Sequence, residues 1–557
     1  MNATLTDAQA PSARRRQRGQ TLIIMAFLMV FLISLLGLVV DTVRLYILSI
    51  QAERAAEAGA LAGALYMPNF YDASNPAPDG EYATRRICEA VKQNGITSCP
   101  VAAGQIGVTP SLVAGNQYRL QVTVTLQANV FFLAFVSPGF STATVSRSAV
   151  AEYLPAIQLG SRTSYFGDAQ DGLQAFVAHI NGPWEQKEHG DAYTPKFEDG
   201  WTDPVTHPDT CCSPVPRFLP NMVSTNLQKY PSAIANPDSQ PTGFTGASGT
   251  LGYNYQIVVP ATAASGVEVQ IATPAFNPYG GGADNEDNLC DDPSLTPSPC
   301  ASDQGINYMQ LTYSLYSTPL LFERSQDVLV ASFSPPSLDL LAADLTKHGC
   351  GGAQAFDPAA QTCVAQPAYL NGWYTLATLN SLGTYRLVVE ATGGYGQHNY
   401  GVKLTDTSNN VFANGSGVSI KAWNDMCVAF NLSAGVTSTF DLAEIPAAYA
   451  GKTLNFSLFD PGDGGGNIFM RILDPSGNPA TWPNWALTVP ASNGTQLNAS
   501  GGRYNGQWLH VPIQIPTSYN PAAGADWWQV EYFASQAGGD VLSINVSLAG
   551  SPIHLTP

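Results

Sequence analysis

The sequence predicts a mostly β protein in which one N-terminal transmembrane helix and a small α/β module precede two jelly-roll-like β-sandwiches. An uncharged apolar run covers residues 22–40, and helical sequence continues from it to about Tyr66. Beyond Tyr153 short apolar strands alternate with turns, and the chain holds 51 glycines and 40 prolines to make them. No helical period persists in this later part, so we expect sandwiches rather than helix-covered sheets.

Composition excludes several classes of protein. A chain of 557 residues is too long for one compact core, so we expect several domains. A hydrophobic fraction of 45% is too high for an intrinsically disordered protein. The formal net charge of −18 has the wrong sign for binding phosphate backbones, so we expect no nucleic-acid partner.

The apolar run predicts a membrane anchor. At 1.5 Å per residue, a helix over Leu22–Val40 would be about 28 Å long, which matches a hydrocarbon core. Four arginines between residues 14 and 18 precede it, so the positive-inside rule places tail 1–20 in the cytoplasm, span 21–41 in the membrane and the body outside. A cleaved signal peptide is the competing interpretation. The apolar run is, however, longer than the apolar core of a signal peptide, and helical sequence follows it without a break. We therefore expect a single-pass cytoplasmic-membrane protein.

Two stretches of this N-terminal part resemble the TadE/TadG-like Flp-pilus-assembly proteins. The first holds Arg18-Gly19-Gln20, the apolar span, the Val40-Asp41 exit and a run of small residues to Ala64. The second, Tyr118 to Tyr153, holds a strand, a Phe-rich patch and a closing strand. The resemblance covers about residues 1–154, with the helix and small β module over 42–154. It implies a structural or assembly component of a Tad/Flp-type pilus or secretion apparatus, with the membrane and other proteins of that apparatus as partners.

The sequence departs from the family pattern in two places. Pilin-like members carry Glu five residues after the processing Gly, whereas this chain has Ile24, so the resemblance favours the anchored TadG type over a processed pilin. Many TadG proteins also carry a von Willebrand A domain with an Asp-x-Ser-x-Ser metal motif. The nearest string, Asp72 to Pro76, lacks the final Ser, so we expect no such metal site.

The helix beyond the span is rich in Ala and Gly between residues 55 and 64. Small side chains permit close approach of another element. Two alternatives stay open: this face packs on the protein's own β module, or it receives a helix of a partner.

The body contains an internal repeat. Residues 255–274 and 440–461 each read as a strand ending in Pro-Ala, a loop turning at Gly, and an apolar strand ending in Pro. Similar closing strands follow near residues 384–404 and 527–550. We therefore expect sandwiches over 155–408, with an irregular insertion, and 409–557.

Nine cysteines point to an oxidising compartment. Three pairs are 10 to 13 residues apart across turn-forming sequence and suit local disulfides, with reduced buried thiols and metal ligation as alternatives. These pairs are Cys88–Cys99, Cys290–Cys300 and Cys350–Cys363; the pairing of Cys211, Cys212 and Cys427 stays open.

Two acidic, Gly-rich loops are candidates for calcium, which binds six to eight hard oxygens. The alternative is an ordinary solvated turn, because turns demand the same residues. The candidate ligands are Asp284, Glu286, Asp287, Asp291 and Asp292 in one loop, and Asp460, Asp463 and Asn467 in the other. We expect no other cofactor.

The sequence predicts no enzyme, since standard catalytic and phosphate-binding motifs do not occur. A surface module binding glycans or calcium-dependent partners is the alternative function, with an envelope hydrolase behind it. For the hydrolase the candidates are His179, Glu185, Glu188, His189 and Asp191, but an ordinary charged loop is the favoured explanation of this cluster. For glycan stacking the candidates are Trp508, Trp527 and Trp528; strand alternation puts Trp527 and Trp528 on opposite faces, so we expect at least one of them in the core.

Overall fold

The structure is a computed structural model with two compact units: Met1–Leu154 with Ser551–Pro557, and Pro155–Gly550. The chain thus leaves the first unit once and returns to it for its last residues, which the sequence had placed in the second sandwich. The residues described are 14–67, 83–114, 116–132, 141–154, 157–166, 176–181, 252–260, 263, 266–272, 311–318, 327–335, 338, 348–352, 354–357, 360, 362–367, 373–391, 397–413, 415–423, 425–432, 434–460, 467–482, 494–498, 507–522, 524–535 and 538–556.

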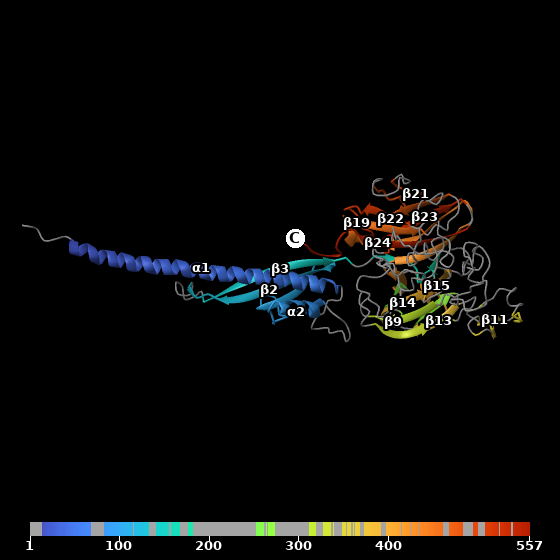
Figure 1. Ribbon diagram of the computed structural model, residues 1–557, viewed down its shortest axis with the longest axis horizontal. Coiled ribbons are helices and arrows are strands. Elements are labelled where there is room, and N and C mark those ends of the chain that lie inside the picture. The colour runs from blue at the N-terminus through green and yellow to red at the C-terminus, as the bar shows by residue number, and fades with distance from the viewer. Residues whose placement is uncertain are drawn as a thin grey trace, which may run out of the picture. The chain divides into compact units, whose positions relative to one another are not determined.

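In the described part of the first unit, helices α1 and α2 accompany a four-stranded antiparallel sheet. Helix α1 (Arg14–Ala64) lies along β2 and β3, and its N-terminal half extends beyond the sheet (Figure 1). Helix α2 (Ala83–Gln93) packs on α1, and its buried side chains include Ile87 and Val91. The sheet order is β1 (Gly107–Val113), β2 (Asn116–Asn129), β3 (Thr142–Tyr153) and β25 (Ile553–Thr556).

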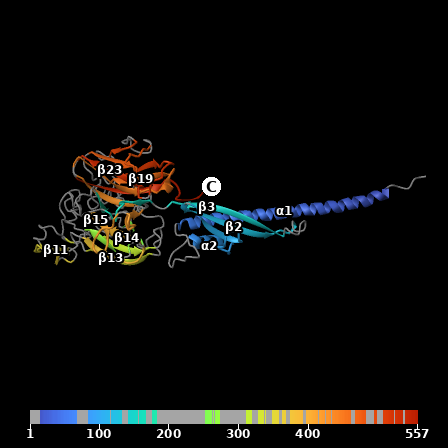
Figure 2. The ribbon, with the colours of Figure 1, turned by 180° about the vertical axis from the view of Figure 1, so that it is seen from behind.

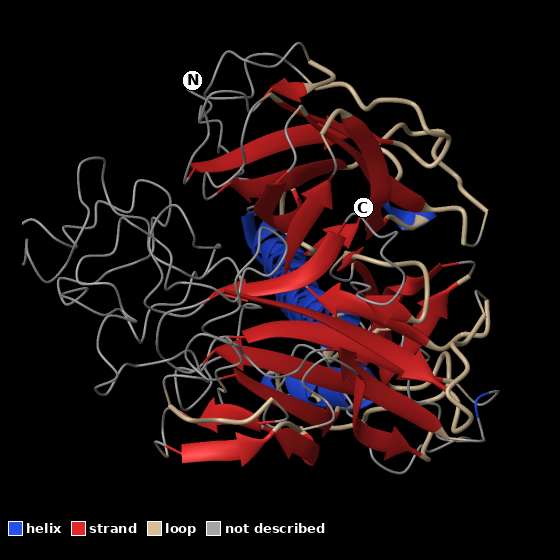
Figure 3. Cartoon of the chain, turned by 90° about the vertical axis from the view of Figure 1, so that its right-hand side faces the viewer, coloured by secondary structure: helices blue, strands red, loops and turns tan. Residues whose placement is uncertain are grey.

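In the second unit, the described strands form two large antiparallel sheets and one small hairpin (Figures 2 and 3). The first sheet has ten strands, in the order β10 (Val328–Phe333), β9 (Leu311–Ser317), β14 (Gly383–Ala391), β7 (Gly252–Val259), β16 (Ser419–Trp423), β4 (Gln158–Leu159), β18 (Val436–Glu444), β23 (Trp527–Ala534), β20 (Ile468–Leu473) and β21 (Leu497–Asn498). The second has nine, in the order β13 (Trp373–Leu379), β8 (Val267–Ala272), β15 (Gln397–Thr405), β6 (Phe176–Asn181), β17 (Asp425–Leu432), β24 (Gly538–Leu548), β19 (Thr453–Asp460) and β22 (Gln507–Gln514), with β5 (Tyr165–Phe166) also on β15. The hairpin pairs β11 (Gln354–Asp357) with β12 (Thr362–Ala365).

The two large sheets pack face to face. On one side of the unit, Tyr255 of the first sheet and Tyr400 of the second share a hydrogen bond of 2.6 Å between hydroxyls, and both rings are buried. Burial raises the pKa of both phenols, so they stay neutral. On the other side, Phe456 and Trp528 have ring centroids 5.8 Å apart. A continuous apolar and aromatic layer therefore forms the core of the unit.

The internal repeat reappears as two matching sets of strands. In the first sheet, β9-β14-β7 of one copy corresponds to β20-β23-β18 of the other. In the second sheet, β8-β15-β6 corresponds to β19-β24-β17. The fold class is thus confirmed as mostly β with antiparallel sheets, and the described strand pairings give no parallel sheet of the von Willebrand A type.

The two copies exchange a strand where they meet. Strand β4 precedes the first copy in the chain but pairs with β18 of the second, and β16 precedes the second copy but pairs with β7 of the first. β4 and β16 also pair with each other, and β6 pairs with β17, so both sheets run through the junction. The boundary predicted between residues 408 and 409 therefore separates the copies along the chain but not in space.

Candidate functional site

Helix α1 exposes apolar side chains on nearly its whole circumference between Leu22 and Val40, apart from Gly37 and the half-buried Ser34. Within the described part of the chain, α1 alone is long and apolar enough to cross a membrane. The hydroxyl of Ser34 donates to the Val30 carbonyl at 2.8 Å, and that of Thr42 donates to the Leu38 carbonyl at 2.7 Å. These polar groups are therefore satisfied within the helix, as a hydrocarbon environment requires.

The small-residue face of α1 is covered by the first unit itself. A Cβ at Gly59 would lie 2.8 Å from Val91 Cγ1, and a Cβ at Gly63 would lie 2.5 Å from Ile87 Cγ1 and 2.6 Å from Leu120 Cδ2. The alanines on this face, Ala52, Ala55, Ala56, Ala60 and Ala64, are fully buried. Of the two alternatives for this face, the structure supports packing on the protein's own module. It leaves no room there for a partner's helix.

Asp41, at the end of the apolar run, joins α1 to the tip of the β2–β3 hairpin. Its carboxylate accepts hydrogen bonds from the backbone N–H of Phe131 at 3.1 Å and of Phe132 at 2.9 Å. These two donors lie just beyond β2, which ends at Asn129. Asp41 is 2% exposed, so its charge is compensated without bulk water.

A buried carboxylate lies where the C-terminal strand returns to the first unit. Glu152 on β3 is 3% exposed and pairs with Arg119 Nε of β2 at 3.0 Å and His554 Nε2 of β25 at 3.5 Å. The Leu154 N–H donates to the Pro552 carbonyl at 2.9 Å. Both chain segments that lead to the second unit are therefore fixed to the same edge of this sheet.

Two of the predicted disulfides are present. Cys88–Cys99 ties α2 to the segment before β1, with Cα atoms 5.4 Å apart. Cys350–Cys363 ties the segment before β11 to β12, with Cα atoms 5.5 Å apart. Cys290, Cys300, Cys211 and Cys212 lie outside the described residues, and Cys427 is buried on β17.

Most candidate calcium ligands cannot be placed, because Asp284, Glu286, Asp287, Asp291, Asp292 and Asp463 lie outside the described residues. Asp460 ends β19, and the Asn467 N–H donates to Ser535 Oγ at 2.8 Å. Among the residues that are described, no three His, Cys, Asp or Glu side chains gather around a common point. Calcium binding stays a prediction.

Of the candidate hydrolase residues, His179 alone lies within the described residues. His179 is buried on β6, and its Nδ1 lies 2.7 Å from Asn399 Oδ1 of β15, a contact within the sheet core. Glu185, Glu188, His189 and Asp191 lie outside the described residues.

The tryptophans proposed to stack on sugars are mainly core residues. Trp527 and Trp528 are both buried on β23, although Gln529, Glu531 and Phe533 on the Trp527 face of the strand are half-buried. Lys421 Nζ lies 5.4 Å from the centroid of the Trp527 ring. Trp508 is on β22 opposite Phe459.

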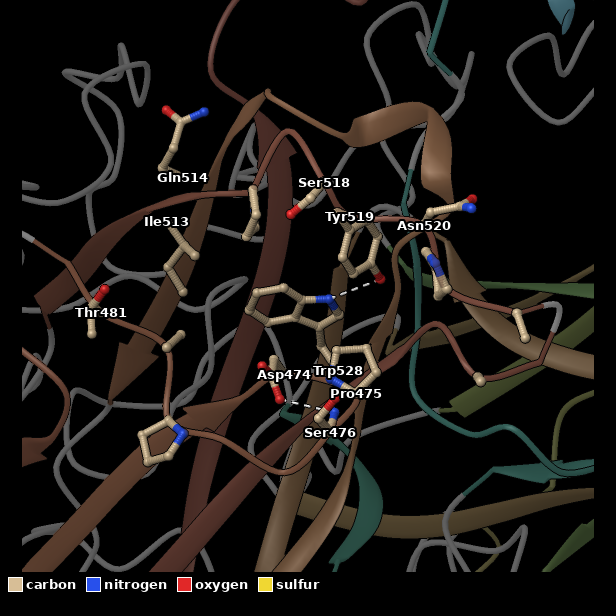
Figure 4. A pocket seen from close by; sticks show the side chains of 16 residues that line it. Asp474, Pro475, Ser476, Thr481, Ile513, Gln514, Ser518, Tyr519, Asn520 and Trp528 are labelled. Carbon is tan, nitrogen blue, oxygen red and sulfur yellow. Dashed lines mark hydrogen bonds between the residues drawn. The ribbon is translucent and has the colours of Figure 1, made fainter.

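Trp528 also lines a pocket of about 590 Å³, shown in Figure 4. Its indole N–H donates to Tyr519 Oη at 3.2 Å, and Tyr519 donates to the Ile445 carbonyl at 2.7 Å. Burial raises the pKa of Tyr519 to about 12. At the pocket floor Asp474 accepts from the N–H of Ser476 at 2.9 Å. The polar groups of Trp528, Tyr519 and Asp474 therefore all have hydrogen-bond partners within the protein, and glycan binding stays a prediction.

The sequence did not indicate the partners of Asp41 and Glu152. An acidic residue directly after an apolar span was the available signal for Asp41, and a lone acid in the closing strand Thr142–Tyr153 was the signal for Glu152.

Comparison with known families agrees with this architecture. The family model Tad, described as Flp pilus-assembly TadE/G-like, matches residues 19–65, which hold the apolar span and the small-residue face of α1. No curated protein matches the chain. The chain therefore carries a TadE/G-like segment with an N-terminal apolar helix, which supports a membrane-anchored role in pilus assembly.

Proposed function

We propose that this protein is a non-enzymatic structural component of a Tad/Flp-type pilus or secretion apparatus, anchored in the cytoplasmic membrane by α1. The observation that carries the proposal is the continuity of α1. One unbroken helix exposes apolar side chains over Leu22–Val40 and then buries its small-residue face in the unit from which the body departs. The body stays tied to the membrane as long as this helix is intact.

The proposed orientation places the N-terminal tail in the cytoplasm and the body outside. Arg14, Arg15, Arg16 and Arg18 precede the span, and cytoplasmic segments carry such an excess of basic residues. Disulfides Cys88–Cys99 and Cys350–Cys363 agree with this orientation, because such bonds persist in oxidising compartments.

The body would act as a platform rather than a catalyst. The chain enters the body after Leu154 and returns from it at Ser551, so two covalent connections join the body to the membrane module. The β-sandwich body would offer a contact surface for other envelope proteins. Its partners would be other proteins of the pilus or secretion apparatus.

Topology can be tested in spheroplasts of a strain that expresses the full chain. A tag at the N-terminus should resist added protease, and a tag after Pro557 should be removed. A protected C-terminal tag would overturn the orientation. Cleavage after Gly19, with the mature protein found along purified filaments, would instead show a pilin subunit.

The assembly role needs a separate variant. Replacing Pro155–Gly550 by a flexible linker keeps β25 and the first unit on one chain. We expect this variant to insert in the membrane and to fail in appendage assembly or adhesion. Normal appendages in cells that carry it would refute a structural role for the body.

A further inference from the structure

We infer that Phe131 and Phe132, which follow β2 in the β2–β3 hairpin, enter the lipid bilayer beside α1, so that the protein contacts the membrane at two places. The strands of the hairpin end at Asn129 and begin again at Thr142, and the Val130 N–H donates to the Ser141 carbonyl at 3.0 Å. Phe131 and Phe132, the two residues here called the tip, follow Val130. The inference rests on the proposed membrane anchoring of α1 and goes beyond it.

The two phenylalanines are exposed where a soluble protein would bury them. Phe131 is 61% exposed and Phe132 is 40% exposed, although both lie directly against α1. Large apolar side chains that stay exposed beside an apolar helix continue its apolar surface. The hairpin tip and the span therefore present one connected hydrophobic surface.

Contacts with α1 fix the depth of the tip. The Phe132 ring lies over Gly37, where an added Cβ would come within 2.3 Å of the ring carbon Cδ1. Gly37 is four residues before Asp41, which at 1.5 Å per residue is about 6 Å deeper along the helix. Since the apolar run extends to Val40, the Phe132 ring lies at the level of the span itself.

Charged groups mark the level of the lipid headgroups. The guanidinium carbon of Arg44 lies 5.0 Å from the centroid of the Phe131 ring, one helical turn beyond Asp41. Arginine at this position can reach lipid phosphates while its stem lies along the apolar surface. Asp41 holds the tip through two backbone N–H groups that would otherwise be unpaired in an apolar medium.

The occupant of this surface is the bilayer rather than another helix. The surface is continuous with the span, which lipid must surround, and it carries Phe side chains rather than the small residues of a close helix contact. Interfacial segments of this kind bury their apolar face about 5–10 Å into the headgroup and acyl boundary. The depth set by Gly37 falls in that range.

Photo-crosslinking of the full-length protein in vesicles of phosphatidylethanolamine and phosphatidylglycerol tests the inference. p-Benzoylphenylalanine is introduced singly at Phe132, at Leu28 within the span, and at Leu112 on β1, an exposed apolar residue near the opposite end of the sheet. We expect lipid adducts at Phe132 comparable to those at Leu28, and about tenfold fewer at Leu112.

The outcomes separate the inference from the proposed function. Adducts at Leu28 without adducts at Phe132 would overturn the inserted tip and leave the anchor intact, whereas their loss at Leu28 would overturn the anchor itself. Adducts from Phe132 to a second protein chain would overturn the lipid as occupant. Asp41→Leu, which removes both acceptors, should lower lipid adducts at Phe132 severalfold with disulfide Cys88–Cys99 still formed. Unchanged adducts in that variant would refute the role of Asp41.

Discussion

Gly63 permits α1 to pack on α2 and β2, so a larger side chain there should loosen the first unit. A Cβ at this position would lie 2.5 Å from Ile87 Cγ1 and 2.6 Å from Leu120 Cδ2, closer than carbon atoms approach without displacement. Both neighbours are fully buried and cannot turn toward solvent. Gly63→Val therefore places three carbon atoms where there is no space.

The size of the effect follows from two opposing contributions. Overpacking a core costs about 1–3 kcal/mol. Valine gains about 0.4 kcal/mol over glycine in helix propensity. The net destabilisation of the contact between α1 and α2 is therefore about 0.6–2.6 kcal/mol, which corresponds to about threefold to eightyfold more frequent opening of α2.

Amide hydrogen exchange on the full-length protein in nanodiscs measures this opening directly. We expect faster exchange of the α2 amides, Ala83–Gln93, in Gly63→Val. Leu61→Val is the matched control, since Leu61 is on the exposed side of the same helical turn. Equal protection of α2 in the wild type and Gly63→Val would refute the packing argument, as would an equal loss in the control.

Three further predictions concern stability. Removing Ser551–Pro557 should lower the melting temperature of the first unit, because β25 pairs with β3 and supplies a partner to buried Glu152. Limited proteolysis of that unit would detect the loss of stability, and unchanged resistance to protease would contradict the prediction. Replacing Cys88 and Cys99 by serine should destabilise the α2 segment by about 2–3 kcal/mol. Amide hydrogen exchange of α2 should then be faster than in the wild type under non-reducing conditions, and equal exchange rates would count against the disulfide. Asp526→Asn should raise the melting temperature at pH 7, because burial, and next the nearby Glu444, raise the Asp526 pKa. A carboxyl group whose pKa is higher in the folded state costs no stability below its unfolded pKa, where both states are protonated, and it lowers the stability of the fold as pH rises above that value. The gain from Asp526→Asn should therefore vanish below about pH 4, and a gain that persisted there would be inconsistent with this cause.

Local patterns in the sequence determined the long apolar helix, the class of fold and two disulfides. The apolar run of Leu22–Val40 needs no tertiary partner to be recognised, because its length and lack of charge already match a bilayer. The paired motifs at 255–274 and 440–461 became equivalent strand pairs, β7 and β8 in one copy and β18 and β19 in the other. Cysteines 11 and 13 residues apart can meet across a turn whatever surrounds them.

Tertiary structure alone decided which distant segments meet. The backbone donors and acceptors of a strand can pair with any neighbouring strand. The sequence therefore did not predict that β4 pairs with β18, that β16 pairs with β7, or that β25 pairs with β3. The same holds for Asp41 and the hairpin tip, which are about ninety residues apart. A carboxylate after an apolar span has many available donors, and only the path of β2 along α1 brings the N–H groups of Phe131 and Phe132 to it.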